Sequence, residues 1–200
     1  MEAVAALEHD AQLMLRVKEG DGESFELLLE KYRSPVISYL YRMVQNQGVA
    51  EELAQEVFFR VYRSRASYEP TAKFTTWLFR IATHLALNSL RDHRNERHQE
   101  SLDEQFEDSR GIQVMDQRRN REQELVAEAR LAEVRRAVAA LPEKQRAAVL
   151  MHKYQEMDYA QIGSVLGCST SAVKSLLFRA YETLRVRLRH MDEQAEQEEL

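Results

Sequence analysis

The stretch DYAQIGSVLGCSTSAVKSLLFRAYETLRVRLRHM, residues 158–191, predicts two helices joined by a tight turn. Asp158 can cap a short helix that ends at Leu166, because its carboxylate accepts hydrogen bonds from free N–H groups at a helix start. Gly167 suits the left-handed residue that ends such a helix, and Ser169 can cap the longer helix that follows. Together they form a helix-turn-helix motif, whose second helix commonly enters the DNA major groove.

The second helix of this motif has an apolar and a polar face. Helical spacing turns four apolar residues inward: Val173, Leu177, Ala180 and Leu184. The outward face carries Ser171, Lys174, Ser175, Phe178, Arg179 and Glu182. Cations neutralise phosphates and short hydroxyl side chains allow close approach to DNA, so this face is a candidate DNA-binding surface.

The composition favours an all-α protein. There are only six glycines and three prolines among 200 residues, and apolar residues recur with helical periodicity. A hydrophobic content of 44% is enough to bury a core in one or two small domains. No apolar run approaches the roughly 18 residues of a membrane span, and the first residues, MEAVAALEHDAQ, lack the pattern of a signal peptide. We therefore expect a cytoplasmic protein with no membrane insertion.

Charge divides the chain into segments. The net charge is −5, yet residues 126–190 hold 11 Lys and Arg against 6 Asp and Glu. Residues 96–125 hold 5 against 9 and few large apolar side chains, which is typical of a tether. We expect two small helical domains, residues 1–95 and 126–190, joined by a flexible linker over residues 96–125. The acidic tail, residues 191–200, is predicted to be solvated and frayed.

The first domain contains three or four predicted helices. Residues 24–44, SFELLLEKYRSPVISYLYRMV, form either one kinked helix or two, because Pro35 interrupts them. Residues 49–65, VAEELAQEVFFRVYRSR, have one broad apolar face made of Leu53, Ala54, Val57, Phe58, Val61 and Tyr62. Phe59 lies on the opposite, charged face. Full burial of such a side chain would contribute about 1.5–3 kcal/mol, and Phe59 does not gain this within its own domain. It is either an ordinary exposed residue or part of a docking surface.

The next helix, FTTWLFRIATHLALNSLRD at residues 74–92, holds the single tryptophan of the chain. A helical wheel places Trp77 in one stripe with cationic and amide side chains, with Lys73 just before the helix: Arg80, His84, Asn88 and Arg91. The adjacent face is apolar, with Leu78, Ile81, Ala82 and Leu85. The stripe is either a core-edge tryptophan beside a solvated face or a polar binding surface.

These three stretches, in this order, resemble a group IV (extracytoplasmic-function, ECF) bacterial sigma factor of the sigma-70 family. The resemblance rests on residues 49–62, 74–92 and 141–184 and covers roughly residues 10–189. It implies a sigma-two helical bundle, which docks on polymerase and melts the minus-ten element, and a sigma-four helix-turn-helix domain for the minus-thirty-five element. The implied partners are promoter DNA, an anti-sigma factor and core RNA polymerase, the last through the clamp coiled coil of its largest subunit and the flap of the second-largest subunit.

The resemblance also assigns roles to residues. The family's polymerase-docking helix matches Leu53, Gln55, Glu56 and Phe59. The loop at residues 65–73 matches the segment that pockets a flipped base, and the minus-ten surface matches Lys73, Trp77, Arg80, His84, Asn88 and Arg91. The minus-thirty-five surface matches Ser171, Lys174, Ser175, Phe178 and Arg179.

Three positions depart from the family pattern. His84 stands where the family often has asparagine, which puts the base preference there in question. Leu176 and Tyr181 replace two arginines of the recognition helix, so we expect fewer DNA contacts from it.

The alternatives to a sigma factor are a free-standing regulator and an enzyme. A free-standing helix-turn-helix regulator would use the same C-terminal motif but would leave the Trp77 helix unexplained. An enzyme is disfavoured, because the chain lacks a glycine-rich phosphate loop, a nucleophile elbow and metal-ligand spacing. We therefore expect no catalytic residues, no metal and no cofactor, and we assign Cys168, the single cysteine, to packing in the turn.

Overall fold

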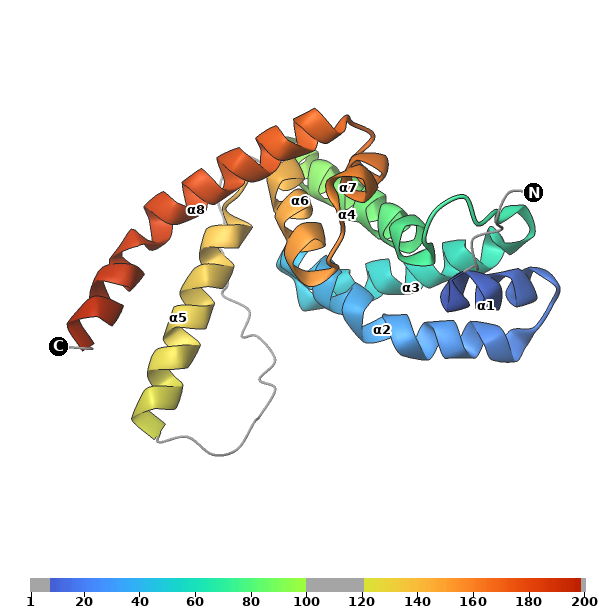
Figure 1. Cartoon of the computed structure of the whole chain (residues 1–200), viewed down its shortest axis with the longest axis horizontal. Helices are drawn as coiled ribbons and strands as arrows, with labels where there is room; N and C mark the ends of the chain where they lie inside the picture. Colours follow the sequence, from blue (N-terminus) through green and yellow to red (C-terminus); the bar gives the residue numbers. More distant parts are fainter. Residues whose placement is uncertain (1–7, 100–120, 199–200) are drawn as a thin grey trace, which may run out of the picture.

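The computed structural model describes residues 8–99 and 121–198, and they form helices and short connections (Figure 1). The elements are α1 (His9–Lys18), α2 (Gly22–Val44), α3 (Gln47–Arg63), η1 (Arg65–Ser67), α4 (Phe74–Gln99), α5 (Arg121–Ala139), α6 (Glu143–Tyr154), α7 (Tyr159–Leu166) and α8 (Thr170–Glu198). No strand occurs within the described ranges, so the all-α prediction is confirmed.

Helix α2 forms the spine of the N-terminal half. Its N-terminus is capped by Asp21, whose carboxylate accepts a hydrogen bond from the Ser24 N–H at 3.2 Å. The helix runs without interruption past Pro35, so of the two alternatives the single helix is the correct one. It ends at Val44, and the C-cap residue Gln45 adopts the left-handed conformation with φ 59°.

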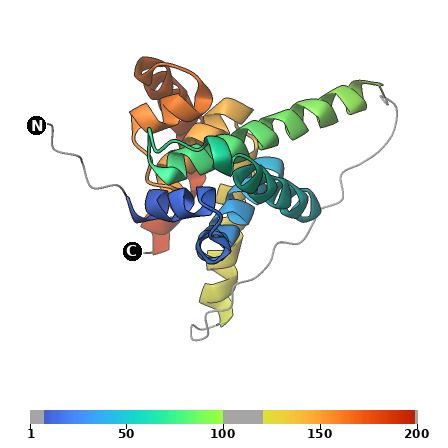
Figure 2. The same ribbon diagram turned by 90° about the vertical axis from the view of Figure 1, so that its right-hand side faces the viewer.

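The N-terminal core lies where α2, α3 and α4 meet, with α1 packed across α2 (Figure 2). Tyr39 and Phe79 pack edge to face, with ring centroids 5.2 Å apart. The Tyr39 hydroxyl lies 2.7 Å from the Thr83 hydroxyl, so both buried polar groups are satisfied. This packing leaves the other sides of α3 and α4 facing outward.

The predicted helix-turn-helix is formed by α7 and α8. Asp158 and Gln161 make a reciprocal capping box at the start of α7, with hydrogen bonds of 2.8 and 2.9 Å. Gly167 ends α7 with φ 65°, and the Ser169 hydroxyl accepts a hydrogen bond from the Ala172 N–H at 3.2 Å. The three predicted caps are confirmed. Pro142 is the N-cap of α6.

The turn between α7 and α8 is tightly packed. A Cβ atom added at Gly163 would lie 2.7 Å from the Cys168 carbonyl oxygen, so a larger residue would force the turn open. Cys168 is partly buried and packs against the core, as expected for a packing residue.

The two halves of the chain pack against each other. Helix α7 lies against α4, α6 contacts α2, and their buried side chains belong to one hydrophobic cluster. The guanidinium of Arg146, in a residue only 8% exposed, donates hydrogen bonds to the carbonyl oxygens of Met43 in α2, Ala139 and Leu141. Arg94 of α4 also forms an ion pair with Glu143 of α6. Polar and apolar contacts therefore both join the halves.

Helices extend into the predicted linker and into the predicted acidic tail. Helix α4 continues to Gln99 and α5 begins at Arg121, so each enters the predicted linker, while residues 100–120 lie outside the described residues. The acidic tail, predicted to be frayed, instead continues α8 as far as Glu198. Among the described residues, no helix has the length and apolar character needed to cross a membrane.

Candidate nucleic-acid and polymerase interface

The outward face of α3 presents an aromatic side chain among polar ones. Phe59 is 57% exposed and does not fold back onto its own core. Gln55 is exposed beside it, and Glu56 accepts a hydrogen bond from Arg60 at 2.6 Å. Leu53 differs from these three because it is partly buried and packs against the core. The four predicted docking residues therefore comprise three surface residues and one that anchors the helix.

Tyr62 was predicted to belong to the apolar face of α3, and that prediction is wrong, because the residue is 44% exposed. Its ring packs on Phe25 at 5.1 Å and under the guanidinium of Arg65 at 4.1 Å. Tyr62 lies one helical turn beyond Phe59, so the exposed aromatic surface of α3 is larger than the sequence indicated. The residue type was a sequence signal for this exposure, because a tyrosine ring with its hydroxyl suits a position that is partly in contact with water.

Trp77 belongs to an aromatic cluster at the start of α4. Its ring centroid lies 4.9 Å from that of Tyr68 and 5.9 Å from that of Phe74. The indole is only partly buried: it packs on the core edge and remains accessible to solvent. The cluster gives the indole a fixed orientation beside the polar stripe.

Tyr68, which the sequence reasoning missed, forms the base of this cluster and is 3% exposed. Its hydroxyl is buried and has no hydrogen-bond partner in the described part of the chain. Burial, and then the nearby carboxylates of Glu8 and Asp10, raise the pKa of Tyr68 to about 12. The residue lies in the loop between α3 and α4, where helical periodicity gives no signal.

The polar stripe of α4 is available to a ligand along its whole length. Lys73 and four residues of the helix are exposed: Arg80, His84, Asn88 and Arg91. From Trp77 to Arg91 the helix rises about 21 Å at about 1.5 Å per residue. This length matches about six steps of 3.4 Å along a DNA strand. An aromatic end followed by amide, imidazole and cationic groups can stack a base and contact the phosphates that follow.

The outward face of α8 is confirmed as solvent-accessible. Its five candidate residues are all exposed: Ser171, Lys174, Ser175, Phe178 and Arg179. Phe178 is 68% exposed. The Ser175 hydroxyl donates to the Ser171 carbonyl oxygen at 3.1 Å, so it is held close to its own helix. The inward residues Val173, Leu177 and Ala180 are buried as predicted.

The two residues that replace family arginines in α8 do not share this outward face. Leu176 and Tyr181 are partly buried and pack against the core. The Tyr181 hydroxyl lies 3.2 Å from His152 Nδ1 in α6, and burial raises the pKa of Tyr181. These positions therefore stabilise the packing of α8 on α6.

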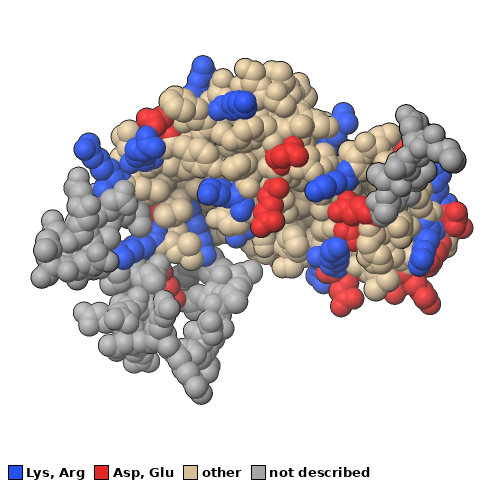
Figure 3. Space-filling view, viewed as in Figure 1, with Lys and Arg blue, Asp and Glu red and all other residues tan. Residues whose placement is uncertain are grey.

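Charge is unevenly spread over the face drawn in Figure 3. Lys and Arg side chains are scattered along the end formed by α8, whereas Asp and Glu gather at the opposite end, around α1 and α2. In the described ranges no group of His, Cys, Asp and Glu could hold a metal ion.

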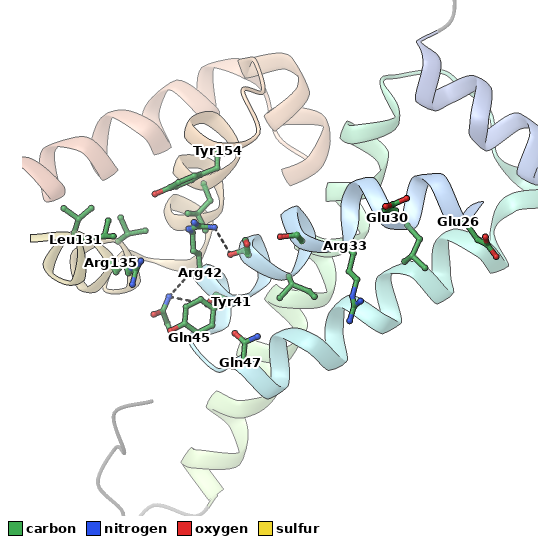
Figure 4. Close-up of a pocket in the computed structure, with 17 residues that line it drawn as sticks. Glu26, Glu30, Arg33, Tyr41, Arg42, Gln45, Gln47, Leu131, Arg135 and Tyr154 are labelled. Atoms are coloured by element: carbon green, nitrogen blue, oxygen red, sulfur yellow. Dashed lines mark hydrogen bonds between the residues drawn. The ribbon is translucent and has the colours of Figure 1, made fainter. Parts of the chain in front are cut away.

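A groove of about 970 Å³ lies between the two halves, lined by α2 on one side and by α5 and α6 on the other (Figure 4). Its lining combines apolar and charged side chains, including Leu29, Ile37, Arg42, Leu131, Val138 and Tyr154. The guanidinium of Arg42 lies 4.3 Å from the centre of the Tyr154 ring, which links the two walls. Side chains of both halves therefore line the groove.

Family comparison accounts for both halves of the molecule. The family model described as Sigma-70 region 2 matches residues 28–96, and the model described as Sigma-70, region 4 matches residues 131–184. The ECF RNA polymerase sigma-E factor of Escherichia coli (strain K12) is 30% identical over 179 residues, covering 88% of this chain and 92% of the relative. This chain belongs to the ECF (group IV) sigma factors of the sigma-70 family. It therefore directs promoter-specific transcription, and the free-standing regulator is set aside because region 2 includes the Trp77 helix that it left unexplained.

Curated relatives and solved structures agree with this membership. The RNA polymerase sigma-H factor of Pseudomonas aeruginosa is 31% identical over 179 residues, covering 88% of this sigma factor and 92% of the relative. The ECF RNA polymerase sigma factor SigW of Bacillus subtilis is 29% identical over 187 residues, covering 88% and 95%. The fold is that of CnrH, solved in complex with the cytosolic domain of CnrY, with a TM-score of 0.66, 21% identity and coverage of 92% and 99%.

A second solved structure has the same fold. The sigma factor RpoE of Bartonella quintana, solved in complex with the anti-sigma factor NepR, gives a TM-score of 0.67 at 18% identity. The alignment covers 84% of this sigma factor and 98% of RpoE.

Proposed function

We propose that this sigma factor works through three surfaces: α3 for polymerase, the α4 stripe for the minus-ten element and α8 for the minus-thirty-five element. Residues 1–95 then act as the sigma-two domain and residues 126–190 as the sigma-four domain. The factor acts in the cytoplasm as a subunit without catalytic residues of its own. The observation that carries the proposal is Trp77, which is held by aromatic neighbours yet open beside an exposed cationic and amide stripe.

The docking surface consists of Gln55, Glu56 and Phe59, with Leu53 holding the helix to its core. Its partner is the clamp coiled coil of the largest polymerase subunit. An exposed phenylalanine among charged residues is a typical hot spot, because it gains burial only when the partner arrives. The sigma-four domain contacts the flap of the second-largest subunit.

Promoter opening takes place at the α4 stripe. A base released from the duplex stacks against the aromatic cluster of Trp77, at a typical value of about 1–3 kcal/mol per base. Lys73, Arg80 and Arg91 neutralise the phosphates of the same strand. His84 and Asn88 lie between these cations and contact base edges, so His84 shifts base preference relative to relatives with asparagine.

Recognition of the minus-thirty-five element takes place at α8. Lys174 and Arg179 bind phosphates or base edges in the major groove, Ser171 and Ser175 allow close approach, and Phe178 supplies an apolar contact such as a thymine methyl group. Because Leu176 and Tyr181 face inward, this contact uses fewer cations than is usual in the family.

An anti-sigma factor is the proposed regulator, and its binding site is the groove between α2 and α5. A helix seated there would touch both halves at once and fix the closed arrangement. Apolar residues such as Ile37 and Val138 would bury its apolar face, and Arg42 and Arg135 would pair with acidic side chains. The complex of Bartonella quintana RpoE with NepR motivates this part of the proposal.

Two exposed phenylalanines give a matched test of the assignment. Phe59→Ala is expected to weaken binding to core polymerase by about 1–3 kcal/mol and to leave the DNA contact of α8 unchanged. Phe178→Ala is expected to do the reverse, lowering transcription from promoters with a minus-thirty-five element while polymerase affinity stays constant. Equal effects of both variants on both measurements would contradict the division of surfaces.

A further inference from the structure

The loop between α3 and α4 is held at two places by the N-terminal helix. Lys18 Nζ, in the last turn of α1, donates to the Tyr68 carbonyl oxygen at 3.0 Å. The Phe74 N–H, at the start of α4, donates to a carboxylate oxygen of Glu8 at 3.3 Å. Both bonds connect segments far apart in the sequence. Helix α1 lies outside residues 28–96, which region 2 of the family matches.

These two bonds act on the residues that support Trp77. Tyr68 is 3% exposed, and its ring lies against Trp77 and, at 6.4 Å, against Phe74. A displaced Tyr68 backbone would move the surface on which the indole rests. The Glu8 carboxylate lies at the positive end of the α4 dipole, which favours this position for an acidic group. Helix α1 therefore constrains both the loop and the first turn of α4.

Helix α1 is itself firmly attached. The Asp10 carboxylate is buried and accepts hydrogen bonds from Lys31 at 2.7 Å and from the Tyr32 hydroxyl at 2.5 Å. Met14 and Val17 lie in the core with exposures of 0% and 1%. The helix can thus transmit its position to the loop. Lys18 is an exposed residue outside this core, so its bond to Tyr68 serves the loop and not the attachment of α1.

We propose that Lys18 and Glu8 are positioning residues for promoter opening. They hold Tyr68 and Phe74 so that the Trp77 ring is oriented for an unpaired base before DNA arrives. This inference rests on the proposed role of the α4 stripe in binding melted DNA. Neither residue contacts DNA, and both act through the aromatic cluster.

The test compares Lys18→Met, Lys18→Arg and Arg16→Met in reconstituted holoenzyme. Arg16 is an exposed cation of the same helix, and in the described part of the chain its side chain makes no hydrogen bond to the loop, so it controls for charge. The measurements are the rate of open-complex formation on a duplex promoter, base preference in a randomised minus-ten selection, affinity for core polymerase, and the unfolding midpoint of the free chain.

Lys18→Met is expected to slow opening roughly threefold to tenfold, as for loss of one charged hydrogen bond at a partly exposed site. It should also broaden the preference for the minus-ten base that the loop between α3 and α4 would pocket. Lys18→Arg keeps a donor and should restore both properties, and Arg16→Met should match the unmodified protein. Polymerase affinity should be the same for all of them.

Two results would overturn the inference. One is that Lys18→Met behaves like Arg16→Met. The other is that it lowers polymerase affinity or the unfolding midpoint while base preference is unchanged, which would indicate a merely structural bond.

Trp77→Ala, measured in parallel, separates this inference from the proposed function. If Trp77→Ala slows opening while Lys18→Met has no effect, only the role of α1 fails. If Trp77→Ala leaves opening unchanged, the assignment of the α4 stripe fails, and the positioning role fails with it.

Discussion

Replacement of Arg146 by methionine would test how the two halves of this sigma factor are held together. The guanidinium donates to three backbone carbonyl oxygens, and the one on Met43 belongs to the other half of the chain. Methionine keeps much of the apolar stem but provides no donor. The carbonyl oxygens of Met43, Ala139 and Leu141 would then lose their partner in a site where Arg146 is only 8% exposed.

The expected loss of stability in Arg146→Met follows from the number and kind of hydrogen bonds that the guanidinium makes. A hydrogen bond to a charged group contributes about 1.5–3 kcal/mol net. Burial lowers the pKa of Arg146, and its Nε atom has no partner among the described residues, so desolvation offsets part of the sum. We expect the free energy of unfolding to fall by about 2–4 kcal/mol. The loss of the Met43 bond should also let the halves separate.

The assay combines denaturant unfolding with a distance measurement between spin labels at Glu51 and Arg185, both exposed, in a Cys168→Ser background. Arg94→Met is the matched control, because it removes the Arg94–Glu143 ion pair, whose arginine side chain is 61% exposed. An exposed pair contributes about 0–1 kcal/mol, so little change is expected. If Arg146→Met has the stability and distance distribution of Arg94→Met, the reasoning about the buried guanidinium is refuted.

Three further variants test other parts of the account. Trp77→Ala should reduce open-complex formation more than closed-complex binding, with partial recovery on a pre-melted bubble template; equal losses on both templates would indicate misfolding. Burial raises the pKa of the Asp10 carboxyl, but the hydrogen bonds from Lys31 and Tyr32 together outweigh burial and lower this pKa below 3.8. The contribution of Asp10 to stability is therefore present above that pH and is lost as pH falls through the lowered pKa. Asp10→Asn should therefore flatten the acid limb of a stability–pH profile, and an unchanged limb would contradict this role. Tyr181→Arg should destabilise the sigma factor by about 1–2 kcal/mol in thermal unfolding without a gain in promoter affinity, because this position faces His152; tighter DNA binding would show that it faces outward.

Much of the fold could be predicted because its signals are local. Asp158, Gly167 and Ser169 each act within one turn of their own helix, so their residue types alone predict the ends of α7 and α8. The inward face of α8 followed from helical periodicity for the same reason. The continuity of α2 across Pro35 could not be decided in this way, because it depends on packing against α3 and α4.

The candidate site was predictable only in part. The exposed stripe from Arg80 to Arg91 follows from a helical wheel, but Tyr68 does not, since it lies in a loop and joins Trp77 through tertiary packing. The bond from Lys18 to that loop connects residues 50 positions apart, a distance at which periodicity carries no information. The same holds for Arg146, because charged side chains are seldom buried and its burial depends on the carbonyl oxygens of Met43 and Leu141.

The most direct test of the central claim is in vitro transcription with purified core polymerase, this chain and a library of genomic DNA fragments. We expect transcripts from a small set of promoters that share two sequence elements at a fixed spacing. Trp77→Ala should remove most of these transcripts, and Phe178→Ala should relax the requirement for the upstream element. Absence of chain-dependent transcripts, together with sequence-specific DNA binding by the chain alone, would contradict the claim that it directs polymerase to promoters.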